Sequence, residues 1–156
     1  MKPARIVRRA VPAVVPIAGD RHPVLQRIYA ARGITDVPQL DYRLAALLPP
    51  ALGGIERACE ILEEAIRSER RIVVVGDFDC DGATGTAVAV RGLRMLGARH
   101  VDYGVPNRAT HGYGLSPALV EDLLAKRPDL IVTVDNGIAA HAGIAAAHEH
   151  GIRVVV

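Results

Sequence analysis

Residues 72–82 read Ile-Val-Val-Val-Gly-Asp-Phe-Asp-Cys-Asp-Gly, an apolar run that leads directly into three aspartates spaced one residue apart. The run of β-branched residues predicts a buried β-strand. If the chain stays extended beyond it, Asp77, Asp79 and Asp81 point to one side and the residues between them to the other. Three carboxylates on one side repel one another unless a cation lies among them, and a set of oxygen donors favours Mg²⁺ or Mn²⁺ over Zn²⁺ or Cu²⁺. The stretch therefore predicts a metal site at the end of a strand.

The composition is that of a soluble globular protein of one domain. The chain has 156 residues, of which 50% are hydrophobic and 23% charged, and this length is enough to bury a core. A formal net charge of +2 does not by itself indicate a nucleic-acid binder, and four Tyr with one Phe leave no visible platform for stacked bases. No apolar run approaches the ~20 residues of a membrane span, so we expect no membrane association.

Cys59 and Cys80 are the only cysteines, one in a helical pattern and the other inside the acidic stretch. A disulfide framework is therefore not expected, and a reducing compartment, the cytoplasm, fits better. We expect Cys80 to be a small buried thiol that points away from the carboxylates.

The chain is expected to fall into three parts. Residues 1–21 are basic and broken by prolines, which predicts an extended N-terminal arm. Residues 22–69 are predicted to be a helical segment whose first helix covers Pro23 to Arg32. From residue 70, four short apolar strands alternate with helices. The first of these helices is predicted from about Thr84 to Leu96.

This alternation predicts an α/β fold, a parallel sheet with helices on both faces. Right-handed crossovers align the carboxyl ends of the strands at one edge, where open α/β sheets bind ligands. The three aspartates follow one strand at that edge and Asp135 follows another, which makes Asp135 a candidate ligand that bridges two cations. The strand predicted over residues 152–156 ends without a polar tail or a cap. We therefore expect the domain to be truncated at its C-terminus and its site to be incomplete.

Other motifs share parts of the acidic stretch. An EF-hand loop would need a glutamate in place of Val88, and a P-loop would need a lysine near Gly82 or Gly85. The nucleophile motif of haloacid-dehalogenase-type phosphatases stays open, with Asp79 as nucleophile and Asp81 as acid/base. A further alternative is that the acids only cap the next helix and oppose its dipole, although four acids at one edge exceed what a cap needs.

Two further segments are candidates for contact with a phosphate. Thr84 and Gly85 are predicted at the start of a helix, where free backbone N–H groups bind phosphate. The polar loop at residues 107–114 contains Arg108, which suits phosphate pairing, and Tyr113, which suits stacking on a base or sugar. The alternative is an ordinary surface loop with solvated side chains.

Three motifs resemble those of a known family. They are the run Val74-Val75-Gly76-Asp77-Phe78-Asp79-Cys80-Asp81-Gly82-Ala83-Thr84-Gly85-Thr86, then Pro106-Asn107-Arg108 with His111-Gly112-Tyr113-Gly114-Leu115, and then Val132-Thr133-Val134-Asp135-Asn136-Gly137. In this order they are similar to the DHH phosphoesterases, and among these to the bacterial exonucleases specific for single-stranded DNA.

The resemblance implies a Rossmann-like catalytic domain, of which residues 70–156 are the N-terminal part. It implies Mn²⁺ or Mg²⁺, two ions in the complete enzyme, with Asp79, Asp81 and Asp135 as ligands and candidate catalytic residues. Asp77 is then a further ligand or an acid behind the ligands. The candidate substrate-binding residues are Thr84, Gly85, Asn107, Arg108, His111, Tyr113 and Asn136.

The activity that the resemblance implies is metal-dependent 5′→3′ hydrolysis of single-stranded DNA in DNA repair and recombination, without a covalent aspartyl intermediate. The implied partners are single-stranded DNA, a single-strand-binding protein and a helicase. In this family the next strand ends in Asp-His-His, so we expect the 156 residues alone to be inactive. The alternatives are the phosphatase named above and a non-catalytic fragment that binds a metal or a partner.

Overall fold

The computed structural model describes Val7, residues 21–47, Pro49 and residues 51–156. The chain divides after Ala51 into two units, and each is described by itself. The extended arm predicted for residues 1–21 lies outside the described residues, except for Val7 and Arg21.

In its described residues, the first unit contains one α-helix and two short 3₁₀ helices. Helix α1 (Pro23–Ala31) begins at Pro23 and is capped by His22, whose ring accepts from the Val24 N–H. This confirms the helix predicted from Pro23, which ends one residue earlier than expected. The 3₁₀ helices η1 (Val37–Leu40) and η2 (Leu44–Ala46) follow, and the first carries a capping box formed by Asp36 and Gln39.

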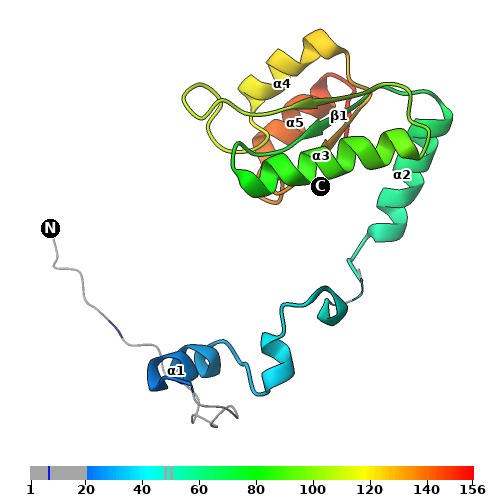
Figure 1. Cartoon of the computed structure of the whole chain (residues 1–156). Coiled ribbons are helices and arrows are strands. Elements are labelled where there is room, and N and C mark those ends of the chain that lie inside the picture. The colour runs from blue at the N-terminus through cyan, green and yellow to red at the C-terminus, as the bar shows by residue number, and fades with distance from the viewer. Residues whose placement is uncertain (1–6, 8–20, 48, 50) are drawn as a thin grey trace, which may run out of the picture. The chain divides into compact units, whose positions relative to one another are not determined.

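The second unit is a four-stranded parallel sheet with strand order β2-β1-β3-β4. Figure 1 draws this unit with β1 and helices α2 to α5 labelled. Its elements in chain order are α2 (Ile55–Arg67), β1 (Ile72–Val75), α3 (Cys80–Met95), β2 (Val101–Gly104), α4 (Pro117–Leu123), η3 (Leu124–Lys126), β3 (Leu130–Thr133), α5 (His141–Glu149) and β4 (Arg153–Val155). The predicted α/β fold with a parallel sheet is confirmed.

Helices cover both faces of the sheet because the side chains of β1 alternate between them. Val73 and Val75 pack into a cluster with residues of α4 and α5, whereas Ile72 and Val74 pack with residues of α2 and α3. All four side chains are at most 1% exposed. Burying one such side chain contributes about 1.5–3 kcal/mol, so β1 is the centre of the core. Within the described residues, no helix has the length and apolar composition to cross a membrane.

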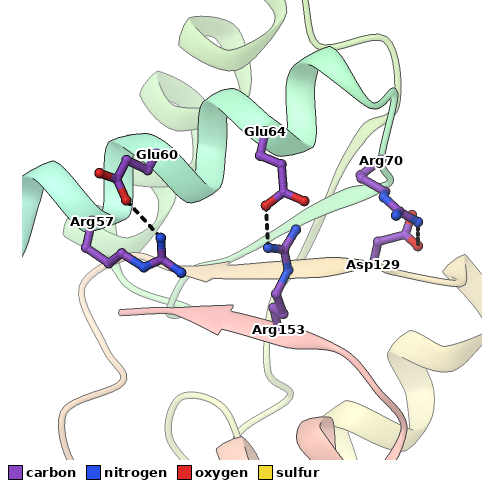
Figure 2. Close-up of polar contacts among 6 residues, drawn as sticks. All are labelled: Arg57, Glu60, Glu64, Arg70, Asp129 and Arg153. Atoms are coloured by element: carbon purple, nitrogen blue, oxygen red, sulfur yellow. Dashed lines mark hydrogen bonds and ion pairs between the residues drawn. The ribbon is translucent and has the colours of Figure 1, made fainter.

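Helix α2 is joined to the far edge strand by a charged contact (Figure 2). Glu64 on α2 accepts from Arg153 on β4 at 2.7 Å, and this guanidinium lowers the pKa of the Glu64 carboxyl. Asp129 likewise accepts from the Arg71 N–H at 2.8 Å and lies 3.5 Å from the Arg70 guanidinium. Exposed ion pairs contribute about 0.2–1 kcal/mol each, so the apolar contacts of α2 hold it on the sheet.

Two helical glycines form a matched pair for testing the packing. A Cβ at Gly143 on α5 would overlap the backbone carbonyl of Leu115, whose carbon lies 2.7 Å away, whereas a Cβ at Gly92 on α3 would meet nothing within 4 Å. Gly143→Ala should lower the free energy of unfolding by about 1–3 kcal/mol through overpacking. Gly92→Ala should raise it by roughly 0.5–1 kcal/mol, because alanine is the better helix former. Urea unfolding measures both, and a Gly143→Ala variant as stable as the parent protein would contradict the close contact of α5.

Candidate metal centre

The acidic residues lie at the point of the sheet where the order of the strands reverses. In the order β2-β1-β3-β4, the crossover from β1 to β2 runs in one direction across the sheet and that from β3 to β4 runs in the opposite direction. The loops that follow β1 and β3 therefore diverge from the carboxyl ends of these two strands. Open α/β sheets bind ligands at such a point. Val75 and Thr133 are paired in register at that edge, and the loops with Asp77 and Asp135 follow directly.

Helix α3 begins earlier than the sequence pattern predicts. Its N-cap is Asp79, whose Oδ1 accepts from the Gly82 N–H at 3.0 Å, and the helix starts at Cys80 rather than at Thr84. The expectation that Asp77, Asp79 and Asp81 alternate along an extended chain is therefore wrong, because Asp81 lies in the first helical turn. An aspartate at the N-cap and another in the first turn both stabilise a helix start, and this outweighs the period-2 pattern. Cys80 is exposed, which corrects the prediction of a buried thiol.

Glycines let the first turns of α3 approach the ends of β1 and β3. A Cβ at Gly76 would overlap the Thr86 hydroxyl and lie 2.7 Å from the Gly82 carbonyl oxygen. A Cβ at Gly82 would overlap the backbone of Asp77, and one at Gly85 would overlap the Val134 side chain. The start of the loop after β1, Gly76 and Asp77, is therefore buried under the start of α3.

Asp77 is buried by this close approach. Its side chain is 2% exposed, and its Oδ1 has no hydrogen-bond partner among the described residues. A buried carboxylate oxygen without a donor costs several kcal/mol unless a cation or a proton compensates for it. The burial of this oxygen without a partner therefore supports the prediction of a cation site.

Asp135, which follows the neighbouring strand β3, lies close enough to the other three aspartates for their charges to affect it. Its backbone lies in the left-handed region, with φ at 60°, a conformation that Asp and Asn tolerate better than most residues. Loss of solvent raises the pKa of its carboxyl, and the charges of Asp79, Asp81 and Asp77 raise it further. The pKa of the Tyr113 hydroxyl is raised by loss of solvent and then by Asp77, Asp135 and Asp79. Four carboxylates thus share one electrostatic environment.

The donors fit a hard cation in kind, since all are carboxylate oxygens. Across the described ranges, however, no three His, Cys, Asp or Glu side chains lie close enough together to hold an ion by themselves. Asp79 uses its Oδ1 to cap α3. The assignment of Asp77, Asp79, Asp81 and Asp135 as ligands stays a prediction.

Thr84 and Gly85 lie in the second turn of α3, not at its start. The Thr84 hydroxyl donates to the Cys80 carbonyl at 2.7 Å, and Gly85 provides the close contact with Val134. The helix start predicted at Thr84 was the reason for assigning phosphate-binding N–H groups to these two residues, and that reason does not hold.

The other predicted substrate-binding residues divide into two kinds. Asn107, His111 and Asn136 use their side chains for bonds within the protein. Arg108 and Tyr113 remain exposed, the latter at 66%, although the Tyr113 hydroxyl donates to the Asp135 carbonyl oxygen at 2.9 Å. Asn107 is exposed as well, but its Oδ1 accepts from the Ala109 N–H.

Sequence reasoning missed two residues that contact this group. The Arg108 guanidinium carbon lies 4.8 Å from the centroid of the Phe78 ring, and Asp122 on α4 lies 2.9 Å from His111 Nε2. The alternation argument pointed Phe78 away from the site, and an isolated aspartate in a helix carries no signal. Neither contact was detectable from spacing.

The fold and the acidic edge define a Rossmann-like α/β domain with a candidate site for hard cations. Residues 71–156, more than half of the chain, match the family model described as "DHH family, N-terminal domain". The chain therefore belongs to the DHH family.

Curated relatives carry the description "Single-stranded-DNA-specific exonuclease RecJ". The relative from Dickeya dadantii is 50% identical over 96% of this chain and that from Escherichia coli is 47% identical over 96%. A solved structure described as exonuclease RecJ bound to manganese is 44% identical, with a TM-score of 0.62 over 69% of this chain and 28% of its own. The chain spans about a quarter of the curated relatives, 26% of each.

The cation site can be tested by the change in stability that one substitution causes in two buffers, one with EDTA and one with Mn²⁺. In EDTA, Asp135→Asn should raise the melting temperature, because it removes one of four mutually repelling carboxylates and keeps a residue that tolerates positive φ. With Mn²⁺ at 100 times its Kd, the parent protein should gain about 2.7 kcal/mol, and the variant should lose most of this gain. Calorimetry measures both.

Asp102→Asn is the matched control. Asp102 lies on β2 and pairs with Lys126, outside the acidic loops, so its substitution should leave the gain from Mn²⁺ unchanged. An equal gain from Mn²⁺ in parent and Asp135→Asn proteins would remove Asp135 from the site.

Proposed function

We propose that this chain is the N-terminal part of the catalytic domain of a metal-dependent exonuclease that hydrolyses single-stranded DNA in the 5′→3′ direction. The observation that carries this proposal is the buried, unpartnered Oδ1 of Asp77 at the reversal point of the sheet, next to the loop that carries Asp135. The description shared by the curated relatives supports the choice of substrate. Of the helical segment at residues 22–69, helix α2 packs on the sheet of this domain, and residues 22–51 precede the unit that contains it.

Asp79, Asp81 and Asp135 would hold Mn²⁺ or Mg²⁺, with Asp77 as a further ligand or as an acid behind the ligands. When bound, such ions stabilise charge on the phosphoryl group and activate water for attack. Manganese is the ion named for the solved relative. Asp77 is held rigidly, because Gly82 and the first turn of α3 lie against its backbone. This fixes one carboxylate before any ion binds and lowers the cost of ordering the site.

Arg108 and Tyr113 are the residues that we assign to the DNA. The Arg108 guanidinium suits a phosphate, because it offers several N–H donors in a planar fork. The Tyr113 ring is exposed while its hydroxyl is bonded to the Asp135 carbonyl oxygen, so the ring is held beside the acidic loop as a surface for a base or sugar. The loop between β2 and α4, which carries Arg108 and Tyr113, is held by side-chain bonds of Asn107, His111 and Asn136.

For the whole protein we propose single-stranded DNA as the substrate, and a single-strand-binding protein and a helicase as partners in DNA repair and recombination. We place this activity in the cytoplasm. The haloacid-dehalogenase-type alternative would use Asp79 as a nucleophile, and the Oδ2 that is not used in the capping bond from Gly82 would serve either role. The description shared by the curated relatives favours the nuclease over the phosphatase.

The decisive assay uses the protein expressed from its complete gene, because the chain spans 26% of its curated relatives. Single-stranded oligonucleotides labelled at the 5′ or the 3′ end are incubated with Mn²⁺ and compared with duplex. We expect mononucleotides to be released first from the 5′ end of the single strand. Asp135→Asn should reduce kcat by at least about a hundredfold, since it removes a charge that holds the ions.

Asp102→Asn again serves as the control and should keep full activity. Substantial nuclease activity in the Asp135→Asn protein would sink the metal assignment. An acid-labile phosphoenzyme formed on Asp79, without DNA hydrolysis, would instead support the phosphatase.

A further inference from the structure

The loop between β2 and α4, residues 105–116, is closed on itself by Asn107 and His111. The His111 N–H donates to the Asn107 carbonyl oxygen at 2.7 Å, and His111 Nδ1 accepts from the Asn107 N–H at 3.0 Å. Because Nδ1 accepts, Nε2 carries the proton and donates to Asp122 on α4, 2.9 Å away. Asn107 Oδ1 also accepts from the Ala109 N–H at 2.9 Å. The backbone on both sides of Arg108 is therefore fixed.

The same loop is tied to the carboxyl ends of β1 and β3. Asn136 Oδ1 accepts from the Leu115 N–H at 3.2 Å, while its Nδ2 donates to the carbonyl oxygens of Val75 and Val134 at 3.0 and 2.9 Å. The Tyr113 hydroxyl adds the bond to Asp135. The loop is thus attached directly to the two segments that carry the acidic residues.

Arg108 is the cation in this loop, and it is not neutralised by a carboxylate. It is exposed, and it forms no ion pair with any described residue. Its guanidinium instead lies over the Phe78 ring at 4.8 Å. A guanidinium on an aromatic face is attracted through the ring quadrupole, and its N–H donors stay free at the rim of the plane.

Phe78 has no evident role in the core. It is 37% exposed and belongs to neither hydrophobic cluster of the second unit. It stands between Asp77 and Asp79, so its ring brings the Arg108 guanidinium to the acidic loop without an ion pair. A guanidinium paired with one of these carboxylates would compete with a cation for the same oxygens and use up its own donors.

We propose that Phe78 is a positioning residue, which holds the Arg108 guanidinium beside the acidic loop with its donors free for a phosphate of the DNA. This inference rests on the proposed function for the identity of the ligand. The contact between the ring and the guanidinium is a property of the protein without DNA. The two levels can therefore be tested apart.

The test is a double-mutant cycle in the protein expressed from its complete gene, with Phe78→Leu, Phe78→Tyr, Arg108→Ala and the combination of Phe78→Leu with Arg108→Ala. Phe78→Leu keeps an apolar side chain but removes the ring face, and it should raise KM for single-stranded DNA roughly two- to fivefold with little change in kcat. Phe78→Tyr should restore the parent KM. Arg108→Ala should flatten the slope of log binding constant against log salt by about 0.7, as expected for one lost phosphate contact.

In the Arg108→Ala background, Phe78→Leu should have no further effect on KM. An equal rise in KM in both backgrounds would mean that the ring acts on the DNA itself or on the fold, and would overturn the proposal. A protein that neither binds nor cleaves DNA would refute the proposed function instead.

The contact itself is then decided by NMR on the DNA-free protein. The Arg108 Nε–H resonance should shift in Phe78→Leu, which loses the aromatic ring, and stay in place in Phe78→Tyr. The same resonance position in parent and Phe78→Leu proteins would refute the inference whatever the substrate.

Discussion

The close approach of α3 to the end of β1 is the constraint on which the rest of the site depends. It exists because residues 76 and 82 have no side chain: a Cβ at either position would overlap the Thr86 hydroxyl or the Asp77 backbone. The approach buries Asp77, and Asp79, two residues further on, caps the N-terminus of α3. A buried, unpaired carboxylate oxygen is tolerated only where something else compensates for it. The backbone geometry thus leaves a buried carboxylate oxygen that a cation or a proton would have to compensate.

A second constraint joins this loop to its neighbours. Asn136 bonds to the ends of both central strands and to the loop between β2 and α4, while Tyr113 bonds to the backbone of Asp135. Three segments distant in sequence are therefore held by a few directional bonds at one edge of the sheet. This is why Arg108 can project from a loop and still have a fixed position relative to Phe78.

The strands, their parallel order and the meeting of Asp77 with Asp135 at one edge could be predicted, because apolar runs and right-handed crossovers follow general rules. The start of α3 could not be predicted from alternation alone, since Asp79 serves both the pattern of an extended chain and that of a helix cap. The exposed Cys80 and the inner position of Thr84 follow from that one error. The stacking of Arg108 on Phe78 and the bond from His111 to Asp122 join residues far apart in sequence, where spacing carries no information.

The three bonds of Asn136 also bear on how related sequences should be compared. One side chain must accept from the Leu115 N–H and donate to two carbonyl oxygens within a fixed reach. Aspartate lacks the donors, and glutamine is one methylene too long. If relatives always have asparagine at this position, the reason would therefore be its structural role and not a part in the reaction. A member of the family that had lost its activity would still be expected to keep the asparagine.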